Sequence, residues 1–304
     1  MITNPNVKIN LGLNVLRKRE DGFHDLETLF VPYFGICDML EIVVGDDYSR
    51  TSAALFSKYG LSEPASQGSV KPEGVFGVET EESSAPKLVQ GISEDGKLMI
   101  TIAREEGVDW DPLKDLTAKA YNILAADFKL PPVKIFLEKT SPVGAGLGGG
   151  SADAAFALKM LNELCILGLT EQQLADYASR LGSDCAFFIY NRPMIGEGRG
   201  EILSEYHVDL EKYDIQVITP AIAVSTKDAY SGIRPHLPEV PLREALARPV
   251  EQWDGVLVND FEETVFVKYP ELAAIKRSLY DSGAVYASMS GSGSALFAIY
   301  SKEL

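Results

Sequence analysis

Residues 142–155 are Pro142-Val143-Gly144-Ala145-Gly146-Leu147-Gly148-Gly149-Gly150-Ser151-Ala152-Asp153-Ala154-Ala155, and five of the seven positions from Gly144 to Gly150 are glycine. Before this stretch, apolar and polar residues alternate over 133–138, a period of two that predicts a strand. After it, apolar residues recur at helical spacing over 151–165, and Ser151 stands where the N-cap is expected. The sequence therefore predicts a strand, a glycine-rich loop and a helix N-terminus in succession.

A glycine-rich loop at the start of a helix suits a phosphate group. The first backbone N–H groups of a helix have no partner within it, and the helix dipole places partial positive charge at the same end. Glycine lets the backbone approach an anion that a Cβ would keep away. We therefore expect this loop to bind phosphate.

Known glycine-rich loops fit the stretch to different degrees. Gly144, Gly146 and Gly149 match the dinucleotide pattern G-x-G-x-x-G, but that pattern opens a βαβ unit, and here a second helix is predicted next. The P-loop requires a lysine where this chain has Gly150. A phosphate loop of another kind fits better, and a plain flexible hinge is disfavoured because a hinge needs no helix cap.

Composition narrows the class of protein. The chain has 304 residues, enough for one large domain or two ordinary ones. A net charge of −16 argues against a nucleic-acid partner and against an anionic membrane surface. The three cysteines and three histidines show no spacing typical of disulfides or zinc. Without a signal-peptide pattern or a run of 18 apolar residues, a cytoplasmic protein without membrane contact is expected.

The same patterns predict the other elements. Strands are expected at 7–13, 40–44, 97–103, 215–218, 284–289 and 295–300. Helices are expected at 116–128 with Asp115 as N-cap, at 171–181 with Thr170 as N-cap, after Ser225, and at 272–282. The segment from about 46 to 96 is rich in Ser, Gly, Glu and Pro, which predicts an insertion with at most short strands, such as 75–78.

Taken alone, the other notable polar residues have ordinary interpretations. Lys8 lies on the polar face of the first strand, where a solvated lysine is usual, and His24 is typical of a surface loop. Asp184 follows Gly182, which ends a helix, and is consistent with a second N-cap. The serine-rich turn 290–294 is either a simple hairpin or a segment that closes the phosphate site.

Three separated stretches nevertheless resemble the three motifs of the GHMP kinases. They are Asn6-Val7-Lys8-Ile9-Asn10-Leu11, the loop 142–155, and Ser288-Met289-Ser290-Gly291-Ser292-Gly293. Their order and spacing agree over nearly the whole chain, which is more specific than one glycine loop. The resemblance implies an α+β fold of two domains, at 1–167 and 168–304, with the active site in the cleft between them.

Further stretches are similar to one branch of this family. They are Asp21-Gly22-Phe23-His24, Gly182-Ser183-Asp184 and Gly196-Glu197-Gly198-Arg199-Gly200-Glu201-Ile202-Leu203. That branch uses ATP with Mg²⁺ to phosphorylate the 2-hydroxyl of a small molecule, the cytidine diphosphate ester of methylerythritol, on the non-mevalonate route to isoprenoid precursors. Two alternatives stay open: a kinase of mevalonate, homoserine or a sugar, and a non-catalytic kinase-like binding module, which intact Lys8 and Asp184 disfavour.

The resemblance also implies roles for individual residues. Asp184 would accept the proton of the alcohol, and Lys8 would offset charge on the transferring phosphoryl group. ATP would be held by Pro142, Val143, Gly144, Ala145, Gly146, Leu147, Gly148, Gly149, Gly150, Ser151 and Ala152, with Ser151 able to reach phosphate or Mg²⁺. Substrate would be bound by Asn10, Phe23, His24, Ser290 and Gly291. The chain departs from the family pattern at Asn6-Val7, Phe23, Asp115 and Arg199.

Overall fold

The structure is a computed structural model that describes residues 1–45, 57–59, 76–77 and 85–302. The chain divides into two compact units, each assembled from separate segments. Unit 1 contains 1–6, 36–141 and 149–189, and unit 2 contains 7–35, 142–148 and 190–304. Both units combine helices with sheets, which confirms the predicted α+β class. The domain boundary expected at residue 167 stays a prediction.

Unit 1 is built on a sheet whose strand order is β1-β4-β8-β7-β6-β5. All neighbours pair antiparallel except β7 with β8, which pair parallel. The predicted strands at 40–44, 97–103 and 133–138 are confirmed. The bounds are β1 (Ile2–Thr3), β4 (Met39–Val44), β5 (Phe76–Gly77), β6 (Leu88–Ile92), β7 (Leu98–Arg104) and β8 (Val133–Lys139).

The segment expected as an insertion contributes to this sheet. β6 was not predicted, yet Leu88 and Val89 are buried and the strand pairs with β7 along its length. The short strand expected at 75–78 corresponds to β5, which pairs with β6. Most of the remaining segment, 46–56, 60–75 and 78–84, lies outside the described residues.

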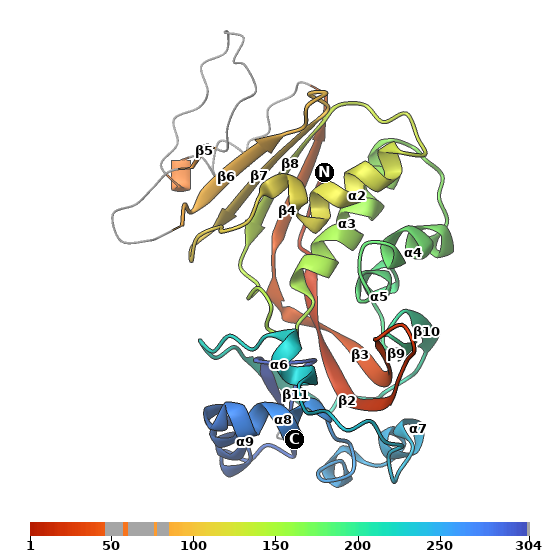
Figure 1. Cartoon of the computed structure of the whole chain (residues 1–304), viewed down its shortest axis with the longest axis vertical. Coiled ribbons are helices and arrows are strands. Elements are labelled where there is room, and N and C mark those ends of the chain that lie inside the picture. Colours follow the sequence, from red (N-terminus) through yellow and green to blue (C-terminus); the bar gives the residue numbers. More distant parts are fainter. Residues whose placement is uncertain (46–56, 60–75, 78–84, 303–304) are drawn as a thin grey trace. The chain divides into compact units, whose positions relative to one another are not determined.

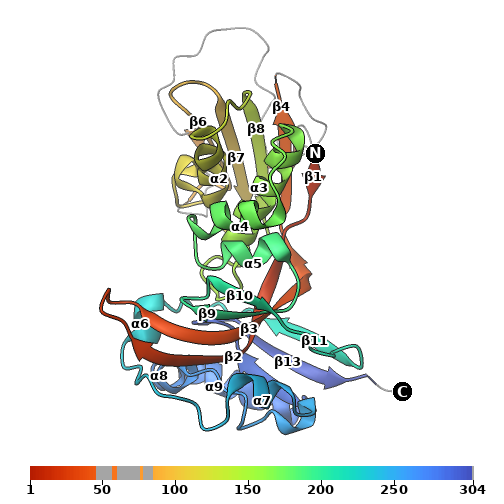
Figure 2. The ribbon, with the colours of Figure 1, turned by 90° about the vertical axis from the view of Figure 1, so that its right-hand side faces the viewer.

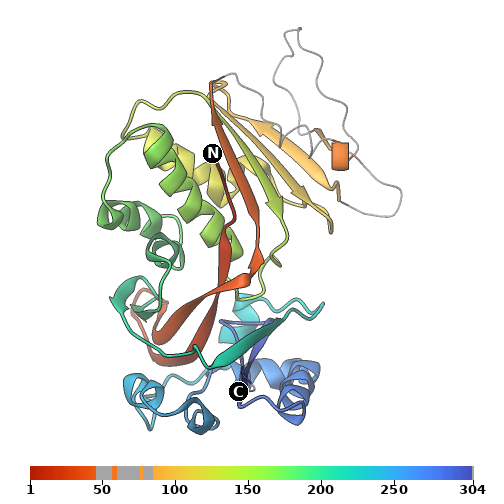
Figure 3. The same ribbon diagram turned by 180° about the vertical axis from the view of Figure 1, so that it is seen from behind.

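The helices of unit 1 are α2 (Leu116–Ala125), α3 (Gly149–Leu164), α4 (Glu171–Ser179) and α5 (Cys185–Tyr190), with a 3-10 turn η1 (Pro112–Lys114). α2 and α3 lie side by side and cover one face of the sheet (Figure 1), and the same layer is seen from behind in Figure 3. Both predicted caps are confirmed. The side chain of Asp115 accepts from the Thr117 N–H, and Thr170 forms a capping box with Gln173.

Unit 2 contains two smaller antiparallel sheets (Figure 2). One has the order β10-β9-β3-β2 and the other the order β11-β13-β12. The strand bounds are β2 (Asn6–Lys18), β3 (His24–Cys37), β9 (Met194–Gly198), β10 (Ile202–Glu205), β11 (Tyr213–Ile218), β12 (Tyr286–Met289) and β13 (Leu296–Ser301). The predicted strands at 7–13, 215–218, 284–289 and 295–300 are therefore confirmed.

The helices of unit 2 are α6 (Thr226–Tyr230), α7 (Leu242–Leu246), α8 (Phe261–Lys268) and α9 (Pro270–Asp281), with a 3-10 turn η2 (Val250–Gln252). Residues of α8 and α9 share one hydrophobic core with residues of β2, β12 and β13. The cap predicted at Ser225 is confirmed, since its hydroxyl accepts from the Asp228 N–H at 3.0 Å. Within the described parts of the chain, no helix is both long enough and apolar enough to cross a bilayer.

Candidate active site

Lys8 lies in a buried environment, although its place on the polar face of a strand predicted a solvated side chain. β2 is buried on both faces from Asn6 to Val15, and Lys8 is only 2% exposed. The prediction of a solvated lysine at this position is therefore wrong. The Lys8 ammonium donates to Asn10 Oδ1 at 2.5 Å and to the Gly146 carbonyl at 2.8 Å. It also lies 5.4 Å from the centre of the Phe30 ring. The structure thus joins Lys8 to the glycine-rich loop.

A hydrogen-bond chain fixes the orientation of Asn10. Its Nδ2 donates to Thr28 Oγ1 at 3.0 Å, and the Thr28 hydroxyl donates to the Gly12 carbonyl. Because the amide nitrogen faces Thr28, the amide oxygen faces the Lys8 ammonium. Thr28 is fully buried on β3 and was not predicted as a site residue. The buried pair Asn10 and Thr28 therefore holds an acceptor in place for Lys8.

The loop 142–148 is held against the serine-rich turn by close backbone contacts. Gly146 has φ +79°, and a Cβ on it would lie 2.1 Å from the Ser290 carbonyl oxygen, so only glycine fits. The Ser290 hydroxyl donates to the Gly146 carbonyl at 3.0 Å and to Asn10 Oδ1 at 3.3 Å. The Lys8 N–H donates to the Leu147 carbonyl at 2.9 Å. Lys8, Asn10, Gly146 and Ser290, predicted from three separate motifs, are thus brought together.

Two residues at the start of α8 support the serine-rich turn and were missed. Asn259 is 3% exposed, and its Nδ2 donates to the carbonyls of Met289 at 2.7 Å and Gly291 at 2.9 Å. Glu262 Oε1 accepts from the Met289 N–H at 2.7 Å. An Asn-Asp pair followed by two glutamates is a helix-start signal that could have located α8 and these side chains.

The start of α3 corrects the predicted cap. The helix begins at Gly149, so Ser151 is its third residue and not its N-cap. Capping preference misplaced the start because glycine is a poor helix former, so Gly149 and Gly150 were not expected to be helical. Burial raises the pKa of the Cys185 thiol to about 12, and a hydrogen bond from Ser151 opposes that shift.

Asp184 directly precedes α5, is partly exposed, and accepts from the Ser183 hydroxyl at 3.3 Å.

Phe23 lies on the turn between β2 and β3, and His24 is the first residue of β3. Phe23 is 54% exposed, and the guanidinium of Arg199 lies 5.1 Å from the centre of its ring. The His24 ring stacks on Tyr230, with centroids 4.9 Å apart and 27° between the planes. Burial, and then the charge of Lys18, lower the pKa of His24 from its usual 6.5. A neutral imidazole beside an exposed aromatic ring can both stack on and hydrogen-bond a nucleobase.

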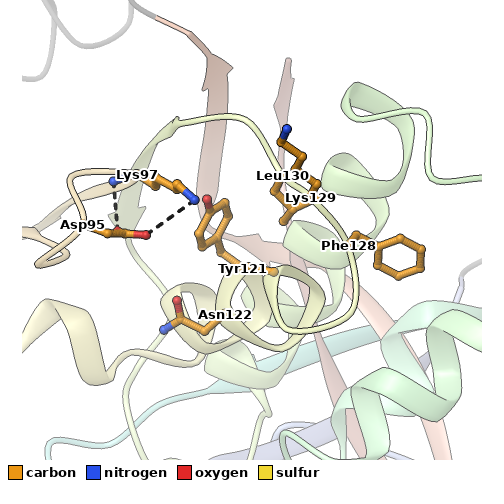
Figure 4. Close-up of a pocket in the computed structure, with 8 residues that line it drawn as sticks. Asp95, Lys97, Tyr121, Asn122, Phe128, Lys129 and Leu130 are labelled. Carbon is orange, nitrogen blue, oxygen red and sulfur yellow. Dashed lines mark hydrogen bonds and ion pairs between the residues drawn. The ribbon is translucent and has the colours of Figure 1, made fainter.

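A pocket of about 200 Å³ occurs elsewhere in unit 1, at the C-terminal end of α2 (Figure 4). The side chains of Lys97 and Tyr121 point toward one another there, and the Lys97 ammonium lies 3.9 Å from the Asp95 carboxylate. None of the predicted site residues lines this pocket. The candidate active site is therefore the cluster around the glycine-rich loop.

Comparisons with known proteins identify the family of the chain. Residues 115–192 match the family model described as the GHMP kinases N terminal domain, and 242–304 match GHMP kinases C terminal. Proteins named 4-diphosphocytidyl-2-C-methyl-D-erythritol kinase from Bacteroides fragilis and Bacteroides thetaiotaomicron are 42% and 43% identical to the chain. Each alignment spans 100% of this chain and 93% of the relative.

Solved structures give the same result. A crystal structure of 4-(cytidine 5'-diphospho)-2C-methyl-D-erythritol kinase matches with a TM-score of 0.68 and 26% identity, over 98% of this chain and 89% of that one. A homoserine kinase from Cytophaga hutchinsonii, 16% identical with a TM-score of 0.60 over 98% of this chain and 86% of that one, shares the fold. The chain belongs to the GHMP kinase family, and it is an ATP-dependent kinase of a small molecule.

Proposed function

We propose that the chain transfers the γ-phosphoryl group of ATP to the 2-hydroxyl of 4-diphosphocytidyl-2-C-methyl-D-erythritol. This reaction belongs to the non-mevalonate route to isoprenoid precursors. The assignment of the substrate rests on the similarity, over the full length of the chain, to proteins named for this activity. The exposed Phe23 ring and the neutral His24 imidazole add support, because a pyrimidine base needs both stacking and edge contacts.

Two residues have chemical roles in this proposal. Asp184 is the base that accepts the proton of the alcohol as the phosphoryl group transfers, which a partly exposed carboxylate can do. The Lys8 ammonium offsets the negative charge that develops on the transferring group. Its hydrogen bond to the Gly146 carbonyl supports this role, because that bond keeps the cation at the loop proposed to bind phosphate.

The loop 142–152 is proposed to hold the triphosphate of ATP. Support comes from Gly146, whose backbone conformation and contact with Ser290 exclude any side chain, and from the helix that begins at Gly149. Among the described residues, no group of three or more His, Cys, Asp or Glu side chains is arranged to hold a metal. Mg²⁺ is therefore proposed to enter as the ATP complex, with Ser151 as a candidate protein contact.

The remaining predicted residues are proposed to bind the substrate. Phe23 stacks on the cytosine ring, and His24 hydrogen-bonds its edge. Asn10, Ser290 and Gly291 are proposed to contact the methylerythritol part. The hydrogen bonds of Asn10 with Lys8, and of Ser290 with Asn10 and Gly146, support this role, because they keep both side chains beside the proposed phosphate loop.

The test is an ADP-release assay with the cytidine ester, mevalonate, homoserine and a sugar as acceptors. The cytidine ester should give the highest kcat/KM. Asp184→Asn should lower kcat by about 10²–10⁴-fold, the usual contribution of a general base, while ATP still binds. A preference for mevalonate or homoserine would contradict the substrate, and near-normal turnover in a folded Asp184→Asn protein would contradict the base.

A further inference from the structure

A buried cluster of charges lies at the end of β8 and was not predicted. It consists of Lys139, Asp38, Asp153 and Ser141, and none of them is more than 5% exposed. The Lys139 ammonium donates to Asp38 Oδ2 at 2.5 Å, to Asp153 Oδ2 at 2.6 Å and to the Ser141 hydroxyl at 3.0 Å. One ammonium thus binds side chains from two separate segments of unit 1, 36–141 and 149–189.

These two segments flank the glycine-rich loop. Ser141 immediately precedes residues 142–148, and Gly149 immediately follows them as the first residue of α3. A Cβ on Gly149 would lie 2.2 Å from Ser141 Oγ and 3.4 Å from Lys139 Nζ. Asp153 comes one turn later on α3. The entry and the exit of the loop therefore meet at the Lys139 ammonium.

The two carboxylates of the cluster have different surroundings. Asp38 also accepts from the backbone N–H groups of Thr140 at 2.6 Å and Ser141 at 2.7 Å, and from the Ser141 hydroxyl at 2.6 Å. Burial opposes ionisation of Asp38, yet Lys139 and the hydrogen bonds lower its pKa. Oδ1 of Asp153 has no hydrogen-bond partner among the described residues, and burial raises its pKa. Asp38 is the firm anchor, and Asp153 depends on Lys139.

The loop itself needs such an anchor. Three of the seven loop residues 142–148 are glycine, which gives the free loop a large conformational entropy that opposes a single binding-competent geometry. A buried ion cluster loses several kcal/mol when one partner is removed, about 3–5 kcal/mol in measured cases, so it can keep two segments together.

We propose that Lys139 is a positioning residue for ATP, acting through the glycine-rich loop. Its ammonium holds Ser141 and the first turn of α3 at a fixed separation, and the loop between them is thereby preorganised for the triphosphate. The proposal rests on the proposed function only in that the loop binds ATP. It does not depend on which alcohol is phosphorylated.

The test compares Lys139→Met and Ser141→Ala with the wild type. Calorimetry gives the ATP Kd, and steady-state assays give KM for ATP, KM for the acceptor and kcat. Lys139→Met should raise the ATP Kd and KM by about tenfold or more, a loss of about 1.4 kcal/mol. Ser141→Ala, which removes only the hydroxyl contacts, should shift them in the same direction by less. The acceptor KM and kcat at saturating ATP should change little. A general loss of structure would instead change these two constants as well.

Lys159→Met is the matched control, because Lys159 lies on α3, the helix that carries Asp153, is partly buried and donates to the Ile189 carbonyl at 3.3 Å. It should leave the ATP Kd unchanged. If Lys139→Met does not fold, Ser141→Ala decides the matter. An unchanged ATP Kd in folded Lys139→Met, or in Ser141→Ala where Lys139→Met fails to fold, overturns the proposal. ATP binding by a wild type that ignores the cytidine ester would contradict the proposed substrate alone.

Discussion

Lys8 and Lys139 are both buried lysines on strands, and both hold part of the same glycine-rich loop. Lys8 in unit 2 donates to the carbonyl of Gly146 in the middle of the loop. Lys139 in unit 1 contacts Ser141 at the loop's entry and binds two carboxylates within 2.6 Å. The ammonium of Lys139 is taken up by buried hydrogen bonds to Asp38, Asp153 and Ser141, so Lys139 is suited to hold structure. Lys8, held at the loop backbone, is suited to meet phosphate.

The largest expected effect separates these two lysines. Lys8→Met should lower kcat by about 10²–10³-fold, the range seen when one charge-stabilising donor is lost. The fold should persist, because the Ser290 hydroxyl remains within hydrogen-bond distance of both oxygens that Lys8 contacts, Asn10 Oδ1 and the Gly146 carbonyl. The measurement is kcat at saturating ATP, together with Tm. A Lys8→Met protein with kcat within threefold of wild type would place Lys8 with Lys139 as a structural cation.

The second prediction compares two glycines in the loop middle. Gly144 and Gly146 both have positive φ, so alanine at either costs about 1–2 kcal/mol in backbone strain. A Cβ on Gly144 meets no described atom within 4 Å, whereas one on Gly146 collides with the Ser290 carbonyl. Gly146→Ala should therefore raise the ATP Kd by clearly more than Gly144→Ala, as measured by calorimetry. Equal effects would show that the contact with the serine-rich turn does not shape the loop.

Sequence patterns located this site but not its supports. Alternation placed Lys8 on a strand, yet it gave no sign that β2 is buried on both faces. That burial arises from distant segments, since the Leu13 N–H donates to the Val258 carbonyl and the Asp260 N–H to the Leu13 carbonyl. Lys139 directly follows the predicted strand 133–138, and no local pattern indicates its partner Asp38, which is 101 positions away.

The missed elements have similar physical reasons. β6 follows a polar segment, and its pairing with β7 overrides that local composition. α3 begins at Gly149, where a Cβ would lie 2.2 Å from Ser141 Oγ, and capping preference does not include this packing. By contrast, the caps at Asp115, Thr170 and Ser225 depend on side chains within a few positions, and all three were predictable.

The third prediction concerns selectivity for the acceptor. His24→Ala should lower kcat/KM for the cytidine ester by about tenfold or more, since a site built around a hydrogen bond to a base loses about 1–3 kcal/mol without it. The ATP Kd should stay the same, in contrast to the effect of Lys139→Met. His236→Ala is the matched control, because His236 is an exposed histidine elsewhere in unit 2. Equal kinetics for His24→Ala and His236→Ala would remove His24 from the substrate site.

The smallest expected effect is a pH dependence that His24 imposes on acceptor binding. Burial, and secondarily Lys18, lower the pKa of His24 below 6.5, so the imidazole is neutral at pH 7 and can both donate and accept. Acceptor kcat/KM should be level above pH 6.5 and fall only as the pH drops through the folded-state pKa. Because the unfolded chain binds this proton more readily, folding stability should decline as the pH falls from 6.5 to the folded-state pKa and level off below it. Lys18→Gln should move the NMR titration midpoint of His24 slightly upward, since burial remains the larger cause. A wild-type midpoint at or above 6.5 would contradict a neutral, partly buried His24.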